Sequence, residues 1–467
     1  MKSSRIKHQS LIILALILIS IIYTLIFLYH FDKLTGAYDL IFHLARIKSL
    51  PTIFKSPINM NVFNYTGQAI NLFYPYLTLL PAAFFYSTTN NLIISYIAYI
   101  FLMTLITLLV SYYCGLSFFN SSRSGFIFAI FYSFAAYRAT DLFFRAALPE
   151  GVALTFMPLV FLGTYKVLER NKNGYWILAL GISLITYTHV LSVIMCLVFI
   201  VLALIIKFCI RFQNIIAILV DFFKSAILTL LLTMAFWLPM LEQMSVQKIN
   251  FPVTRDLQTT LQLGELITES LNNNLAYYGF GLLGLISLFT PIFFKKGKFQ
   301  KKYLYIWYLD LIATFLTTNL FPWRLLQNTP FNIIQFPWRF MGVQSLFASI
   351  LVTYILTTIS TKNSKQLISF FICLNVLIMS ASSINLHRTL ASRTVNLDSI
   401  QRATSTLITY DYVPQKSMKW HNRIHQKYIL YNGNWQKHHY TIENNKFNIK
   451  IVGKNKQVVL PVYYYKG

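Results

Sequence analysis

Long apolar runs constrain this chain more than any other feature of its sequence. Several of them reach the roughly 20 residues that an α-helix needs to cross a bilayer, and the first runs from Leu11 to Leu28. Hydrophobic residues make up 56% of the chain and charged residues only 12%, with a mean hydropathy of +0.55. The sequence therefore predicts an all-α polytopic membrane protein.

The first helix is expected to have a cytoplasmic N-terminus. Lys2, Arg5 and Lys7 precede it, and no small-residue cleavage site follows it, so an uncleaved membrane helix is predicted. The apolar segment 70–87 is broken by two prolines, and it either spans the membrane or stays in the first external loop.

Basic loops favour the second alternative for segment 70–87. If it stays outside, the basic loops 166–172, 207–211, 295–302 and 362–365 all face the cytoplasm, as the positive-inside rule requires. About eleven membrane helices are then expected, at 11–29, 92–113, 125–138, 151–168, 174–188, 190–207, 222–241, 279–294, 303–320, 340–359 and 366–384.

The chain is expected to divide into a transmembrane domain at 1–384, with its first external loop at 30–91, and an extracytoplasmic tail at 385–467. The tail is polar and basic, and residues 440–451 alternate as a strand does. A turn at 453–456 and a partner strand at 458–465 follow. Because a single hairpin is only marginally stable, this small β-rich domain must pack on the membrane loops or be incomplete.

Several function classes are disfavoured. The net charge of +26 suits nucleic acid, but no nucleic-acid motif is present, and basic residues at membrane edges commonly set topology or meet anionic lipid. All four cysteines lie in or beside apolar segments, so no disulfide framework is implied. The sequence has no zinc spacing, P-loop, GxSxG or dinucleotide fingerprint, which argues against a nucleotide-dependent cytoplasmic enzyme.

The stretch 36–47, directly after the first helix, carries an acid, an imidazole and a guanidinium at Asp39, His43 and Arg46. On a helix these three side chains share one face, while apolar residues occupy another. The pattern predicts an amphipathic helix on the membrane surface with a titratable ridge. The alternative is an ordinary solvated face with an Asp–His pair.

A second charged cluster lies between two predicted helices on the outer side. It contains Arg138, Asp141, Arg145 and Glu150. Two arginines and two acids could grip a phosphate and a sugar hydroxyl. The alternative is an interfacial turn with snorkelling arginines.

Two further candidates lie at predicted helix ends. His189 sits at a turn between two apolar runs, as a site residue or as an interfacial polar group. Arg339 belongs to Gln335-Phe336-Pro337-Trp338-Arg339-Phe340, which either anchors a helix at the interface or holds a lipid phosphate. Asp310, inside a predicted helix, is expected to have a partner or to be solvated at the membrane edge.

These motifs, in this order, resemble the bacterial membrane family labelled 6-pyruvoyl-tetrahydropterin synthase-related, a relative of the YfhO-type proteins within the GT-C glycosyltransferase superfamily. That label does not imply pterin chemistry. The resemblance covers nearly the whole chain. It rests on Asp39-x-x-Phe42-His43-x-x-Arg46-Ile47, Phe73-Tyr74-Pro75-Tyr76, Arg145-Ala146-Ala147-Leu148-Pro149-Glu150, Thr188-His189, the Arg339 motif, Tyr410-Asp411-Tyr412-Val413-Pro414 and Leu460-Pro461-Val462-Tyr463-Tyr464-Tyr465.

The resemblance implies inverting sugar transfer from a polyprenyl-phosphate donor to an envelope polymer or glycolipid on the outer face. Asp39 would be the general base and His43 would orient it, while Arg46 would hold the helix or a phosphate. The remaining expected substrate-binding residues are Tyr74, Arg138, Asp141, Arg145, Glu150, His189 and Arg339, with the arginines stabilising the leaving phosphate.

Two departures from the family pattern bear on these expectations. No second acid stands beside Asp39, which disfavours a tightly bound metal and leaves a weakly bound divalent cation open. The family pattern also has more strands after Gly467.

Two non-catalytic hypotheses are alternatives to the transferase hypothesis. A flippase or transporter of a lipid-linked glycan would place polar residues along a pathway through the membrane. The polar clusters fall on one side, however, and no inverted repeat is evident. A scaffold for envelope assembly would keep the fold without the activity.

Overall fold

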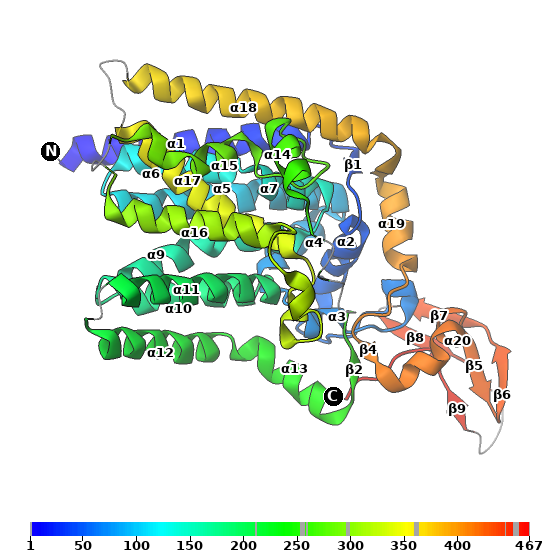
Figure 1. Cartoon of the computed structure of the whole chain (residues 1–467). Helices are drawn as coiled ribbons and strands as arrows, with labels where there is room; N and C mark the ends of the chain where they lie inside the picture. Colours follow the sequence, from blue (N-terminus) through cyan, green and yellow to red (C-terminus); the bar gives the residue numbers. More distant parts are fainter. Residues whose placement is uncertain are drawn as a thin grey trace.

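The computed structural model describes residues 2–210, 213–252, 257, 260–295, 299–358, 364–443, 445–451 and 457–466, with only the backbone at 2–8 and 364–365. Its helices run roughly along one axis (Figure 1). The N-terminus lies at one end of this bundle, and the β-rich tail lies at the other. We call these the N-terminal end and the tail end.

Each of the eleven expected segments contains helix. The bundle helices are α1 (Lys2–Phe27), α5 (Leu92–Phe119), α6 (Ser122–Ser133), α9 (Met157–Leu168), α10 (Gly174–Thr186), α11 (Val190–Ile210), α12 (Ile215–Leu232), α15 (Gly281–Leu288), α16 (Lys301–Thr317), α17 (Met341–Thr358) and α18 (Ser364–Thr389). α18 continues past the predicted domain boundary at 384.

The number of membrane spans is not confirmed as eleven. By length and composition, seven helices of the described residues can cross a membrane. The number is eight if the bent pair Ser122–Ser133 and Ala136–Phe144 forms one span. α10 and α15 have 13 and 8 residues and are shorter than the lengths typical of a span, and α16, with 17, is at the lower end of those lengths.

Segment 70–87 folds into two short helices, α3 (Ile70–Phe73) and α4 (Leu80–Thr89). The ten residues of α4 rise only about 15 Å, half of the roughly 30 Å hydrocarbon core. This length agrees with the prediction that the segment does not span.

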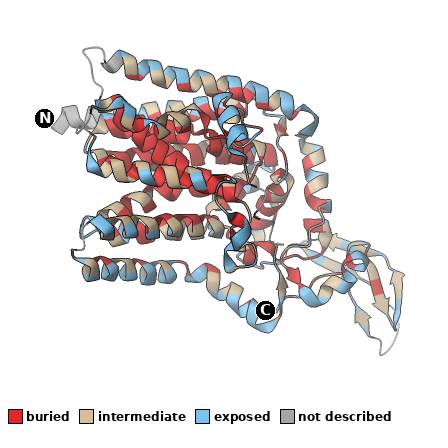
Figure 2. Ribbon diagram, in the orientation of Figure 1, coloured by how far each residue is buried: buried red, intermediate tan, exposed pale blue. Residues whose placement is uncertain are grey.

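The buried core lies along the middle of the bundle, and the peripheral helices are exposed (Figure 2). Nearly every residue of α17 is buried. In contrast, α12 exposes 80% of Ile216 and 66% of Phe223, and α18 exposes 66% of Leu377. Water would oppose such apolar faces, whereas lipid does not.

Short elements cover the tail end. The helices there are α2 (Leu40–Ser49), α7 (Ala136–Ala139), α8 (Leu148–Ala153), α13 (Met234–Val246), α14 (Leu263–Leu271), α19 (Leu397–Thr406) and α20 (His421–His425). The strands are β1 (Lys33–Thr35), β2 (Ile249–Asn250), β3 (Thr394–Asn396), β4 (Val413–Pro414), β5 (Tyr428–Tyr431), β6 (Asn434–Lys437), β7 (Tyr440–Glu443), β8 (Lys446–Ile449) and β9 (Val458–Val459).

The tail packs on the membrane loops, as one of the two sequence alternatives required. Antiparallel pairs β1–β3 and β2–β4 each join a membrane loop to the tail. Lys427 donates hydrogen bonds to the carbonyls of Asn64 (2.7 Å) and Tyr65 (3.0 Å) in the first loop. The tail is therefore held by backbone pairing and by side chains.

The strand prediction for 440–451 is wrong in its pairing. The segment forms two strands, β7 and β8, which pair with each other, while β9 pairs with β5 in the sheet β6–β5–β9. Asn445 lies between β7 and β8 with φ of 62°, and its side chain accepts from Met60 N–H and donates to the Ile58 carbonyl. That turn needs the first loop as its partner. The predicted turn at 453–456 lies outside the described residues.

Candidate functional site

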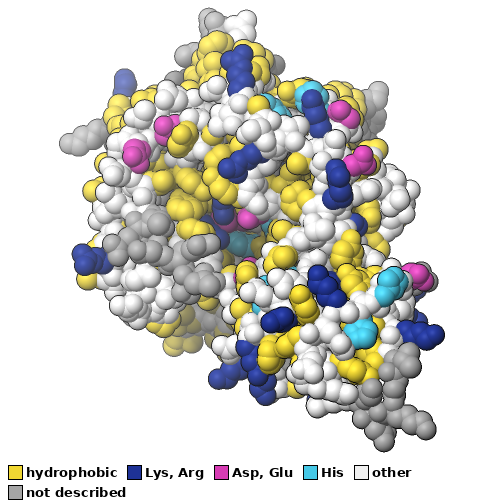
Figure 3. All heavy atoms as spheres, turned by 90° about the vertical axis from the view of Figure 1, so that its right-hand side faces the viewer, with side chains coloured by type: hydrophobic (Ala, Val, Ile, Leu, Met, Phe, Trp, Pro, Cys, Tyr) yellow, Lys and Arg dark blue, Asp and Glu magenta, His cyan; other side chains and the backbone are white. Residues whose placement is uncertain are grey.

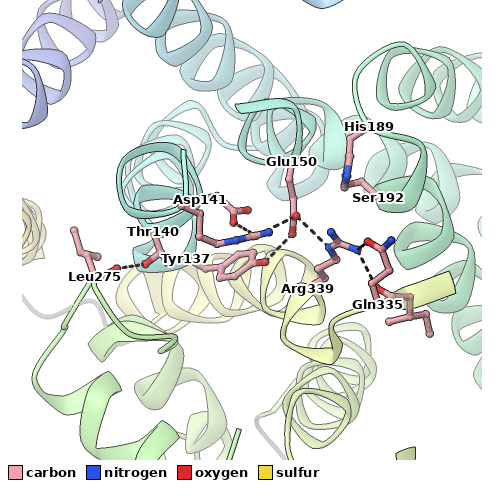
Figure 4. Close-up of polar contacts among 11 residues, drawn as sticks. Tyr137, Thr140, Asp141, Glu150, His189, Ser192, Leu275, Gln335 and Arg339 are labelled. Carbon is pink, nitrogen blue, oxygen red and sulfur yellow. Dashed lines mark hydrogen bonds and ion pairs between the residues drawn. The ribbon is translucent and has the colours of Figure 1, made fainter. Parts of the chain in front are cut away.

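Glu150 is the centre of a buried charged cluster at the tail end (Figure 4). Its Oε2 lies 3.0 Å from Nη1 of Arg145 and 3.1 Å from Nε of Arg339. Its Oε1 accepts a 2.8 Å hydrogen bond from the Tyr137 hydroxyl. Nη1 of Arg145 also lies 2.5 Å from Oδ1 of Asp141. The negative charges of two acids thus balance the positive charges of two guanidiniums. Charges that are buried away from water need such partners.

Local backbone geometry brings Asp141, Arg145 and Glu150 together. A π-helical turn at Thr140–Phe144 follows α7, and the Thr140 hydroxyl donates to the Leu275 carbonyl (3.1 Å). α8 then approaches this turn closely at Gly151. A Cβ there would lie 2.6 Å from Leu142 Cδ2, so any residue larger than glycine would require the Leu142 side chain to shift.

Arg339 reaches the cluster from a distant part of the chain. It lies in the 3₁₀ turn Pro337–Phe340 that leads into α17. Its Nη1 donates to the Ile334 carbonyl (2.9 Å) and to Oε1 of Gln335 (3.0 Å), which fixes the guanidinium plane. The Gln-Phe-Pro-Trp-Arg motif therefore works as one unit, with Gln335 orienting Arg339.

Asp39 lies at the N-cap of α2, beside this cluster. The N–H of Asp39 donates to the Arg145 carbonyl (3.1 Å), and that of Ala37 donates to the Phe144 carbonyl (3.2 Å). Burial raises the pKa of Asp39, as do the charges of Glu150 and Asp411, while Arg145 and Arg339 act to lower it. The side chain makes no capping bond to α2. Asp39 is thus a partly buried carboxyl with a raised pKa next to two guanidiniums.

The prediction of a surface-lying α2 is wrong. His43 and Arg46 are 3% and 0% exposed, and the apolar face of the helix is buried as well. Arg46 donates to Oδ1 of Asn71 (2.9 Å) and to the carbonyls of Tyr74 and Pro75, and its guanidinium lies 4.0 Å from the Tyr74 ring centroid. The polar face of α2 therefore packs on residues 71–75 of the same loop instead of facing water.

Two histidines and Tyr74 border the cluster on its other side. The Tyr74 ring centroid lies 6.0 Å from that of His43 and 6.5 Å from that of His189, whose Nδ1 is 2.9 Å from the Ser192 hydroxyl. Burial lowers the pKa of His43 well below its usual value and that of His189 to about 3, so both are neutral. Burial raises the pKa of Tyr74 to about 12.

Left-handed backbone recurs beside the cluster. Tyr38, Ala146, Gln335 and Tyr412 have φ of 46°, 52°, 62° and 61°. Each stands next to, or within a few residues of, a charged residue of the cluster or its neighbour Asp411. Residues other than glycine rarely adopt this conformation, and such strain gathers at functional sites.

Arg138 lies apart from the Glu150 cluster. Its guanidinium donates to the Ser133 carbonyl (3.1 Å) and to the hydroxyls of Thr104 and Thr107 (both 3.3 Å), and it lies 5.2 Å from the Tyr23 ring centroid. Among the described residues, the hydrogen-bond partners of Arg138 are therefore uncharged groups inside the bundle.

Asp310 is likewise apart from the cluster. It is fully buried, as expected of an acid with a partner, and its Oδ2 accepts a 2.7 Å hydrogen bond from Ser287.

The tail end is hollowed near its centre, and acidic, basic and histidine side chains lie at the bottom of the hollow (Figure 3). Among the described residues, no group of three or more His, Cys, Asp or Glu side chains is arranged to hold a metal ion. These side chains can take up a proton through a carboxylate and bind an anion through guanidiniums.

The structure adds neighbours that were not predicted as site residues. Tyr137 donates to Glu150, and Gln335 holds Arg339. Asp411 acts on the Asp39 carboxyl through its charge, and the ring of Tyr412 lies 6.1 Å from that of Tyr74. Gln335, Asp411 and Tyr412 belong to the motifs quoted above, and Tyr137 directly precedes Arg138 of the second charged cluster, so the sequence signalled their regions but not their roles.

The sequence matches one described family, "6-pyruvoyl-tetrahydropterin synthase related domain; membrane protein", over residues 72–388. The chain belongs to this family of membrane proteins. The predicted family is therefore confirmed, and the matched residues contain the motifs between Phe73 and Phe340 but not those at 39–47, 410–414 and 460–465. A comparison with curated protein sequences gives no match.

Two solved structures are similar to the chain. One is the cryo-EM structure of the arabinofuranosyltransferase AftD from Mycobacteria, with a TM-score of 0.48 and 13% identity over 81% of this chain. The chain spans only 26% of that protein. The other is ArnT from Cupriavidus metallidurans bound to undecaprenyl phosphate, with a TM-score of 0.48 and 10% identity over 85% of this chain and 77% of ArnT.

Proposed function

We propose that this protein is a membrane glycosyltransferase that moves a sugar from a polyprenyl-phosphate donor to an envelope glycan or glycolipid. The tail end would face outward, since the basic loops of the sequence favour a cytoplasmic N-terminal end. The donor class follows from the family resemblance of the motifs. The transfer would take place in the hollow of the tail end, beside Asp39 and the Glu150 cluster.

One observation carries the proposal. A carboxyl with a raised pKa, Asp39, lies beside two guanidiniums whose charges are already balanced by other acids. Asp39 is therefore not needed to neutralise them. Among the described residues Asp39 has no cation within salt-bridge distance, so its partial removal from water costs stability. Such a cost is tolerated where a base is required.

The transfer would be a single displacement. The acceptor hydroxyl oxygen attacks the anomeric carbon of the donor as the bond from that carbon to the phosphate oxygen breaks. Asp39 takes the hydroxyl proton, and the bond electrons leave with the polyprenyl phosphate. Because attack and departure occur on opposite faces of the sugar, the anomeric configuration inverts.

Arg145 and Arg339 would stabilise the departing phosphate. Their contacts within the cluster use Nη1 of Arg145 and Nε and Nη1 of Arg339, so the Nη2 group of each lies outside those contacts. Glu150 would hold both guanidiniums in place. His43 and His189, neutral at pH 7, would donate hydrogen bonds to sugar hydroxyls or accept hydrogen bonds from them without adding charge.

The test is sugar transfer in purified membranes from a radiolabelled polyprenyl-phosphate hexose. We expect label to reach an envelope fraction with the wild type and not with Asp39→Asn. Asp32→Asn is the matched control, because Asp32 is an exposed acid in the same loop and should leave transfer unchanged.

Equal transfer by wild type and Asp39→Asn would exclude Asp39 as the base. A folded wild type that transfers none of a panel of donor sugars would instead favour the flippase or scaffold.

A further inference from the structure

A cavity whose lining contains none of the charged residues of the Glu150 cluster lies among the bundle helices α9, α11, α16 and α17. Its volume is about 200 Å³, and its lining is mostly apolar. Along α9 it extends from Met157 to Glu169, a distance of about 18 Å. The cavity has the length and narrowness of a slot for a hydrocarbon chain.

The polar groups of the lining lie mainly at one end of this cavity. Glu169, Lys207 and Lys302 lie where α9, α11 and α16 reach the N-terminal end, whereas Val343 and Leu346 line it toward the tail end. A lipid in this slot must therefore place its polar head at the N-terminal end. That end is opposite to Asp39 and Arg339.

The charge at this mouth is positive. Lys207 is paired with Glu169, with 2.9 Å between Nζ and Oε1. Nζ of Lys302 lies 4.9 Å from the ring centroid of Phe118 and 4.8 Å from that of Tyr303, and within the described part of the chain it has no carboxylate within salt-bridge distance. Lys302 is thus available to an anionic head group.

We propose that this cavity binds an anionic phospholipid from the leaflet at the N-terminal end, with one acyl chain in the slot and its phosphate against Lys302. The acyl chain gains little hydrophobic free energy by moving from the bilayer into the slot, because both surroundings are apolar. Selectivity must therefore come from the head group. The site is separate from the proposed donor site, and it does not depend on the proposed transfer.

The experiment uses the full-length protein, delipidated in dodecyl maltoside and examined by native mass spectrometry. Phosphatidylglycerol and phosphatidylcholine with identical acyl chains are compared. We expect phosphatidylglycerol to be retained about fivefold better, and Lys302→Glu to remove that preference. Lys172→Glu is the matched control, because Lys172 is exposed at the same end but does not line the cavity.

A filling variant tests the slot itself. Ala203 lines the cavity, and Ala203→Phe should weaken retention of both phospholipids. If Ala203→Phe fails to fold, Ala203→Leu takes its place. Because leucine fills less of the slot, it should weaken retention of both phospholipids to a smaller extent. Equal retention of the two phospholipids by the wild type, or an unchanged preference in folded Lys302→Glu, would overturn the proposal. The proposal would also be overturned if undecaprenyl phosphate displaced phosphatidylglycerol from the wild type and did not bind Lys302→Glu. The slot would then be a binding site for the lipid carrier.

Discussion

Arg138 and Arg145 lie seven residues apart in one motif, yet they occupy very different sites. Arg145 lies among acids, between Asp141 and Glu150, whereas Arg138 binds a carbonyl and two threonine hydroxyls. Both are buried. A buried arginine in a membrane protein is therefore not by itself evidence of a substrate site. The opposite charges and the strained backbone around Arg145 distinguish it.

The largest effect should come from Asp39→Asn. We expect transfer to fall by about 10²–10⁴-fold, the usual contribution of a general base. We also expect the variant to be more stable at neutral pH. Because the pKa of Asp39 is raised in the folded protein, its contribution to stability falls as pH rises from 3.8 through the raised value, and asparagine removes that loss.

These two effects are measured by the transfer assay and by thermal unfolding in detergent. An inactive variant that is also less stable would indicate that Asp39 supports the fold and does not act as a base.

Glu150→Gln should affect both activity and stability. It leaves Arg145 and Arg339 buried with less compensating charge, which costs about 3–5 kcal/mol of unfolding free energy. The misplaced guanidiniums should reduce transfer by about 10²-fold. Transfer assays and denaturation curves check both effects, and a stable, active variant would contradict the central place of Glu150.

Arg138→Met should separate the two arginines. We expect it to lower stability by about 1–3 kcal/mol, since the Ser133 carbonyl and two hydroxyls lose their donor. Transfer per folded molecule should stay unchanged. A reduced kcat at unchanged stability would restore Arg138 to the phosphate-binding role that the sequence suggested.

Asp411→Asn should produce the smallest effect, a shift in the pH dependence. Transfer requires ionised Asp39, so the rate should rise with pH through a raised pKa that lies above the ordinary 3.8. The charge of Asp411 contributes to that rise, so removing it should move the acid limb to lower pH. Rate–pH profiles of the two proteins provide the test, and a shift to higher pH would contradict this electrostatic link.

Local sequence patterns predicted much of the fold. Each of the eleven apolar segments contains helix, because a chain in lipid must satisfy its backbone hydrogen bonds within each segment. Motif resemblance also predicted the family. Strand pairing could not be predicted, because Tyr440–Glu443 and Lys446–Ile449 are separated by a turn that the first loop, 30–91, holds through Asn445.

The sequence by itself determined the membrane class, the helix positions and the motifs in which the charged residues stand. Only the tertiary structure decided which of those charges meet. Arg339 reaches Glu150 across 189 positions of sequence, and α2 turns Arg46 onto the Tyr74 loop instead of the membrane surface. Periodicity fixes which residues share a face of one helix, but the partner of that face depends on packing between distant segments.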